Sequence, residues 1–168
     1  MGGLGKTTLA RKVYNSAKVK KHFNSRTWIY VSNECRVREL LIGIHQNLMS
    51  TKRRSKKHNE AVNNSDDISN LSDDELKKRV WECLKGKKYL LVLDDLWKIQ
   101  DWDEVKDAFP NRNRGSGILI TSRSRQVASH TGRDPPYFLQ FLNEEQSWEL
   151  FSKKVFRGEE YHCDVGSL

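Results

Sequence analysis

Cysteine is scarce in this sequence, and hydrophobic runs are short. The three cysteines, Cys35, Cys83 and Cys163, show no C-x-x-C spacing, which argues against a disulfide framework or a zinc site. The apolar run Tyr89–Leu93 is far too short to span a bilayer, and no basic-then-apolar leader opens the chain. We therefore expect no transmembrane segment and a cytoplasmic or nucleocytoplasmic location.

The charge is uneven along the 168 residues. The whole chain carries +8, but residues 1–58 hold 14 basic and 2 acidic residues, whereas the remainder holds 16 basic and 20 acidic residues. A basic front half is compatible with a nucleic-acid partner or with bound phosphates. The charge alone does not distinguish these two.

Apolar periodicity predicts strands alternating with helices, which is typical of an α/β fold with a parallel sheet covered by helices. Ser72 with Glu75, and Asn143 with Gln146, form the sequence pattern of a capping box, and Gly86 marks a helix end. Residues 50–70 are polar and lack periodicity, so we expect a long loop or insertion there. The predicted helices cover residues 7–19, 37–49, 72–85 and 144 onward, and the predicted strands cover residues 27–31, 89–93, 117–121 and 137–141.

The stretch GGLGKTT near the start of the chain matches the last part of the phosphate-binding loop motif G-x-x-x-x-G-K-[ST]. Glycines let backbone N–H groups approach phosphate oxygens, and the following helix start favours an anion. We expect Lys6 to reach the β- and γ-phosphates, Thr7 to ligate Mg²⁺ and Thr8 to donate to the α-phosphate. A glycine-rich turn that merely starts a helix is the alternative. The predicted phosphate-binding residues are Gly2, Gly3, Gly5, Lys6, Thr7 and Thr8.

Two carboxylates follow the apolar strand at residues 89–93. A carboxylate at the carboxyl end of a buried parallel strand is suited to hold Mg²⁺ from the side opposite the loop. We expect Asp94 to hold the metal through water and Asp95 to orient or deprotonate an attacking water. An acidic turn after a buried strand is the alternative interpretation.

Arg123 follows another apolar strand, Ile118–Ile120, and is predicted to lie at the same sheet edge. An arginine there can sense or stabilise a γ-phosphate, although it could also be a solvated surface residue. The basic cluster at residues 52–58 has no interleaved aromatics, which favours a surface loop over a nucleic-acid site. We expect the five tryptophans to pack in the core or on the surface.

The order of these elements resembles the NB-ARC nucleotide-binding domain of plant disease-resistance proteins, the NLR class of STAND P-loop ATPases. Trp97 after the two acids is similar to the coiled-coil branch of that family rather than the TIR branch. The motifs that carry the resemblance are GGLGKTTLA, the segment from Phe23 to Leu48, KYLLVLDDLW, GSGILITSR and the segment from Tyr137 to Phe156.

The resemblance implies a three-layer P-loop sheet with helices on both faces, in the strand order 5-1-4-3-2. The family's first strand, its GLPL and MHD motifs, and the loop glycine before Met1 are not in this sequence, so we expect Met1 to be a cut inside a longer reading frame or a mis-assigned start. Residues 1–136 would be the nucleotide-binding subdomain, and residues 137–168 the last strand and the start of the helical ARC1 subdomain. The polar insertion is longer than the family's usual connection.

The resemblance also implies a function as an ADP/ATP switch of an innate immune receptor, with Mg²⁺ as cofactor and slow ATP hydrolysis as the reset. Partners in a full-length protein would be coiled-coil, remaining ARC and leucine-rich-repeat regions, and a self-oligomer on activation. We expect at most slow ATPase activity, and weak nucleotide binding or poor folding of these 168 residues alone. A conventional ATPase such as an AAA-type motor, and a nucleic-acid-binding protein acting through residues 52–58, remain alternatives.

Overall fold

The computed structural model of the chain describes residues 3–34, 36–55, 68–110, 115–132 and 135–156. The contacts divide the chain into two units, Met1–Tyr137 and Phe138–Leu168, and each unit is described by itself. No helix in the described ranges is long and apolar enough to cross a membrane.

The first unit contains a parallel three-stranded sheet in the order β1-β2-β3. Its strands are β1 (Ser25–Tyr30), β2 (Tyr89–Asp94) and β3 (Gly117–Ile120). All six residues of β2 are buried, as expected for a central strand covered on both faces. β3 is half-buried along its length, and no described residue pairs with its other edge. The three strands predicted near these positions are confirmed, with ends shifted by one or two residues.

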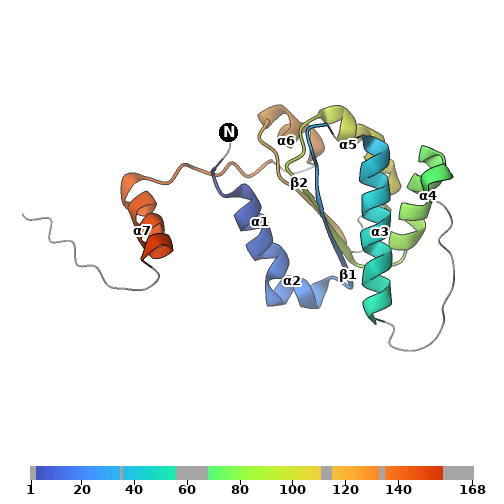
Figure 1. The fold of residues 1–168 in the computed structure, drawn as a ribbon, viewed down its shortest axis with the longest axis horizontal. Coiled ribbons are helices and arrows are strands. Elements are labelled where there is room, and N and C mark those ends of the chain that lie inside the picture. Colours follow the sequence, from blue (N-terminus) through green and yellow to red (C-terminus); the bar gives the residue numbers. More distant parts are fainter. Residues whose placement is uncertain (1–2, 35, 56–67, 111–114, 133–134, 157–168) are drawn as a thin grey trace, which may run out of the picture. The chain divides into compact units, whose positions relative to one another are not determined.

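Helices flank both faces of the sheet in Figure 1. Successive side chains of a strand point to opposite faces, and β1 follows this rule. Trp28 makes an edge-to-face contact with Tyr14 of α1 (Lys6–Asn15), with ring centroids 5.4 Å apart. Ile29, on the other face, packs in the core beside α3 (Val37–Ser55). The three-layer α/β arrangement predicted from the sequence is therefore confirmed.

The single helix predicted over residues 7–19 is wrong, because the structure has two helices. α1 ends at Asn15, and α2 (Ala17–His22) begins directly after Ser16. Ser16 has an extended backbone, and its side chain accepts a hydrogen bond from the Val19 amide. A serine that caps a new helix breaks the continuity that apolar spacing alone suggests.

The helix predicted over residues 37–49 is correct in place but too short. α3 continues to Ser55, so the loop predicted from residue 50 does not begin there. Residues 50–55 are polar, but lysine and arginine are good helix formers, and no glycine or proline intervenes. Residues 56–67 of the predicted insertion lie outside the described residues, and the chain resumes with the 3₁₀ turn η1 (Ile68–Asn70).

α4 (Asp73–Leu84) packs against α3 and begins with the predicted capping box. The Glu75 amide donates to the Ser72 hydroxyl, and the Glu75 carboxylate accepts from the Ser72 amide. Gly86 follows the helix at φ 74°, a conformation that favours glycine. The buried faces of α3 and α4 supply most of one core layer, namely Leu40, Leu41, Ile44, Leu48, Leu76, Val80 and Leu84.

Two short helices were not predicted: α5 (Ile99–Val105) and α6 (Arg125–Thr131). α5 buries Trp102 and Val105 and leads into the 3₁₀ turn η2 (Lys106–Ala108). α6 buries Val127, and its His130 ring nitrogen lies 3.0 Å from a carboxylate oxygen of Asp103. Helices this short depend on tertiary burial more than on intrinsic propensity, so their periodic signal is weak.

In the second unit, α7 (Glu144–Val155) begins with the predicted capping box of Asn143 and Gln146. The strand predicted over Tyr137–Phe141, which was to open the ARC1 region, is wrong, because this segment has no regular secondary structure. A strand needs a hydrogen-bonded neighbour, and in the described ranges no strand pairs with this segment.

Candidate functional site

The predicted phosphate-binding residues gather where α1 begins. Gly3 and Gly5 adopt positive φ angles of 81° and 85°, which a side chain would strain. Gly5 is the N-cap of α1 and offers no side-chain cap, and the first turn of α1 has no acidic residue. The backbone amides of the first turn and the helix dipole at this end therefore favour an anion. Lys6, Thr7 and Thr8 form the first turn, whereas Gly2 lies outside the described residues.

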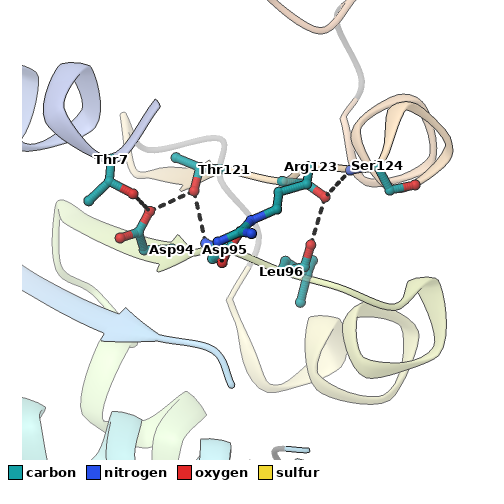
Figure 2. A network of polar contacts seen from close by, with 8 residues as sticks. Thr7, Asp94, Asp95, Leu96, Thr121, Arg123 and Ser124 are labelled. Atoms are coloured by element: carbon teal, nitrogen blue, oxygen red, sulfur yellow. Dashed lines mark hydrogen bonds and ion pairs between the residues drawn. The ribbon is translucent and has the colours of Figure 1, made fainter. Parts of the chain in front are cut away.

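Asp94, the last residue of β2, connects this loop to the sheet edge. Its Oδ1 accepts a hydrogen bond from the Thr7 hydroxyl at 2.9 Å and from the Thr121 hydroxyl at 2.6 Å. The residue is 1% exposed. Figure 2 shows these three side chains converging from α1, β2 and the end of β3. Two predicted site residues, Thr7 and Asp94, are thus brought together by direct contact.

Asp95 is held in an unusual backbone conformation directly after β2. Its φ is 64°, a left-handed value that aspartate tolerates better than most residues. Its amide donates to the Thr121 hydroxyl at 2.8 Å. Thr121 thereby contacts both acids, donating to Asp94 and accepting from Asp95. Sequence reasoning assigned no role to Thr121, although a hydroxyl directly after the strand beside an acidic strand end was a usable signal.

Arg123 and Asp95 form a bidentate ion pair. The Nε and Nη2 of Arg123 donate to Oδ1 and Oδ2 of Asp95, each at 3.0 Å (Figure 2). Such parallel contacts fix both distance and orientation. Asp95 is nearly buried, and the side chain of Arg123 is 45% exposed. The structure therefore brings the two predicted catalytic residues together.

Trp97 also contacts Arg123. The guanidinium carbon lies 4.9 Å from the centroid of the Trp97 ring, within the range of a cation–π interaction. The contact was not predicted, because tryptophans were expected only to pack. Beside it, the Ser122 hydroxyl donates to the Leu96 carbonyl at 2.6 Å and accepts from the Ser124 amide at 3.1 Å, which ties the two loops together.

Other candidates do not join this site. The side chains of the basic cluster at residues 52–58 lie outside the described residues. The structure therefore does not test whether this cluster binds nucleic acid. Histidines are dispersed: His22 contacts the Gly115 carbonyl, and His130 contacts Asp103. Over the described residues, no group of three or more His, Cys, Asp or Glu side chains is placed to hold a metal ion. The Thr7 hydroxyl and the Asp94 carboxylate are oxygen atoms at this site that could hold a metal ion.

A glycine-rich loop at a helix start, an acidic strand end and an arginine thus lie together in the first unit. Residues 1–161 match the family model of the NB-ARC domain. The chain belongs to this family. NB-ARC domains are nucleotide-binding P-loop domains, and the α/β sheet agrees with that fold.

Three relatives from Arabidopsis thaliana illustrate the NB-ARC similarity. Disease resistance protein RPP13 is 41% identical over 158 residues, covering 94% of this chain and 18% of the relative. Putative disease resistance RPP13-like protein 3 is 40% identical over 161 residues, covering 93% and 18%. Disease susceptibility protein LOV1 is 37% identical over 159 residues, covering 93% and 16%. The chain thus spans less than a fifth of the length of these relatives.

Proposed function

We propose that this NB-ARC chain is the ADP/ATP-binding switch region of a plant disease-resistance receptor. The observation that carries the proposal is the contact of Thr7 with Asp94, which unites the phosphate loop with the acidic strand end. The similarity of the chain to proteins that are named for disease resistance supports the proposed biological role. In the proposed cycle, ADP holds the receptor off, exchange for ATP opens it, and slow hydrolysis resets it.

Each loop residue has a distinct proposed role in binding. The amides after Gly5 would cradle phosphate oxygens, Lys6 would neutralise the β- and γ-phosphates, and Thr8 would donate to the α-phosphate. The site suits Mg²⁺, because a hydroxyl and a carboxylate oxygen lie 2.9 Å apart and Mg²⁺ prefers oxygen ligands. Thr7 would hold the ion directly and Asp94 through water. A bound Mg²⁺ would neutralise phosphate charge.

Hydrolysis would use Asp95 and Arg123. Asp95 would orient a water molecule and take its proton as the water oxygen bonds to the γ-phosphorus. The bond from that phosphorus to the bridging oxygen breaks, which leaves ADP and inorganic phosphate. Arg123 would stabilise the charge that develops on the γ-phosphoryl oxygens. Both Asp95 oxygens already accept from Arg123, which restrains the base and is consistent with slow turnover.

The proposed switch region comprises two subdomains within a larger receptor. We assign residues 1–136 to the nucleotide-binding subdomain and residues 137–168 to the start of ARC1, and the division after Tyr137 supports this boundary. Coiled-coil, further ARC and leucine-rich-repeat regions, a self-oligomer on activation and a cytoplasmic location belong to the same proposal. Differential contacts of the γ-phosphate with Lys6 and Arg123 would supply the energy of the switch.

Calorimetric titration of the full-length protein with ADP tests the proposal. We expect Lys6→Arg to weaken ADP binding by about tenfold or more, because a charged hydrogen bond to phosphate is lost or misplaced. Lys12→Arg is the matched control, since Lys12 is exposed in the last turn of the same helix. Equal ADP affinity for wild type and Lys6→Arg would refute the assignment of Lys6.

A further inference from the structure

The guanidinium group of Arg123 is held on two sides at once. One edge is paired with Asp95 through Nε and Nη2, and one face lies against the Trp97 ring. Nη1 makes no hydrogen bond to any described residue. An arginine fixed by one edge and one face keeps a defined direction for its remaining N–H groups.

Asp95 is the rigid side of this arrangement. Its side chain is 8% exposed, and its amide is bonded to Thr121. The side chain of Arg123 is 45% exposed and has four rotatable bonds of its own, so its direction depends on what holds it. Asp95 holds one edge of the guanidinium group, and the Trp97 ring covers one of its faces.

The indole N–H of Trp97 supplies an independent observation. The Nε1 atom is buried and has no hydrogen-bond partner within the described ranges. A buried N–H without a partner is unfavourable, so stability alone does not explain this ring position. The same ring position places the face of the indole against Arg123. We therefore attribute this position of Trp97 to function rather than to packing.

We propose that Trp97 is a positioning residue that lets the site distinguish a nucleoside triphosphate from a diphosphate. This inference rests on the proposed function, in which Arg123 meets the γ-phosphate. Trp97 and Asp95 together present Arg123 to that phosphate in a fixed orientation. A diphosphate has no such group, so its binding does not depend on Trp97.

The test compares the binding of a non-hydrolysable ATP analogue and of ADP, with Mg²⁺, to the full-length protein. Trp97→Leu should weaken triphosphate binding about three- to tenfold, because the cation–π contact is lost, and should leave ADP binding within about twofold. Trp97→Phe retains an aromatic face and should keep most of the discrimination. Trp81→Leu is the control and should change neither affinity. The Nζ of Lys85 lies 4.8 Å from the centroid of the Trp81 ring, and Trp81 takes part in none of the site contacts described above.

A second substitution guards against misfolding of Trp97→Leu. Tetrafluorotryptophan placed only at position 97 keeps the ring shape but depletes the electron density of its face. In the protein with tetrafluorotryptophan at position 97, the ratio of ATP-analogue affinity to ADP affinity should fall as it does in Trp97→Leu. In the Arg123→Ala background, either change at position 97 should have no further effect on that ratio, because Trp97 acts through Arg123.

Three results would overturn the role of Trp97. These are equal weakening of both nucleotides, an unchanged ratio with tetrafluorotryptophan, and an undiminished effect of Trp97→Leu in the Arg123→Ala background. If wild type binds neither nucleotide, the proposed function fails and this inference with it. If Lys6→Arg binds ADP as tightly as wild type, the assignment of Lys6 fails. If Lys6→Arg weakens ADP binding while Trp97 changes leave the ratio intact, only the inference fails.

Discussion

The Thr7 hydroxyl donates to the Asp94 carboxylate at 2.9 Å, although the two residues are 87 positions apart in the sequence. The contact joins the first turn of α1 to the end of β2. The same carboxylate oxygen accepts from Thr121, which follows β3. Three separate segments therefore meet at one buried acid, and a change in any of them is expected to alter the others.

Asp94→Asn should strongly reduce the dependence of triphosphate binding on Mg²⁺. Asparagine has nearly the same size and can still accept from Thr7, but it carries no charge to attract a metal-bound water. We expect the metal-stimulated part of the affinity to fall by about 10- to 100-fold. Titrations with and without Mg²⁺ measure this, and ADP binding without metal should stay within about twofold. An Mg²⁺ effect equal to that of wild type would exclude the proposed role of Asp94 in holding the metal through water.

Asp95→Asn should slow ATP hydrolysis by about 10²- to 10⁴-fold while triphosphate still binds, because the amide cannot take a proton from water. Asparagine tolerates the left-handed backbone found at this position, so the loop should keep its shape. Phosphate release in a single turnover measures the rate. Asp107→Asn, on an exposed residue of η2, is the control. Hydrolysis at the wild-type rate in Asp95→Asn would rule out Asp95 as the base.

The capping box of α4 should make stability depend on pH in the acid range. Hydrogen bonds from the Ser72 backbone and side chain lower the pKa of Glu75 below its ordinary value of 4.5. A lowered pKa in the folded state means that this contact stabilises the fold above pH 4.5 and that its contribution is lost as the pH falls through the folded pKa.

Ser72→Ala tests this cap. Urea unfolding at neutral pH should show a loss of about 1 kcal/mol, because the Glu75 amide loses its acceptor. The difference from wild type should narrow in acid, where Glu75 is protonated and accepts more weakly from the Ser72 hydroxyl. Ser72→Thr keeps the hydroxyl and should stay near wild type. A Thr variant as unstable as the Ala variant would contradict the capping role.

Leu41→Ala should destabilise the first unit by about 2–5 kcal/mol, since a buried leucine leaves both lost contacts and a cavity. Leu41 is fully buried in the layer between α3 and the sheet. Leu150→Ala is a matched control, because Leu150 on α7 is 48% exposed. Chemical denaturation followed by circular dichroism measures both. Equal small losses for the two variants would mean that the α3 layer is not a packed core.

Local rules predicted much of the fold. The caps at Ser72 and Asn143 are read within four residues, and the buried strand Tyr89–Asp94 is read from its continuous apolar character. The meeting of Asp94, Asp95 and Arg123 at one edge follows from parallel strands that all end in polar residues. These features depend on short stretches of chain and on a single topological rule.

The rest depends on contacts between distant segments. The break at Ser16 requires knowing that its side chain turns to the Val19 amide, which apolar spacing does not encode. Tyr137–Phe141 has strand composition but no described partner strand, and β-propensity expresses packing more than backbone preference. The Trp97–Arg123 contact depends on rotamers across two loops, so no sequence pattern announces it.

Amide hydrogen exchange of the full-length protein with and without ADP tests most directly whether phosphates bind where α1 begins. We predict that ADP slows exchange at the amides of residues 3–8, which would donate to phosphate oxygens, and that Lys6→Arg reduces this protection at equal ADP concentration. Amides of Leu40 to Leu48 in α3 serve as the internal reference and should change little. Protection elsewhere with none at residues 3–8, or no ADP effect at all, would contradict the assignment of this site.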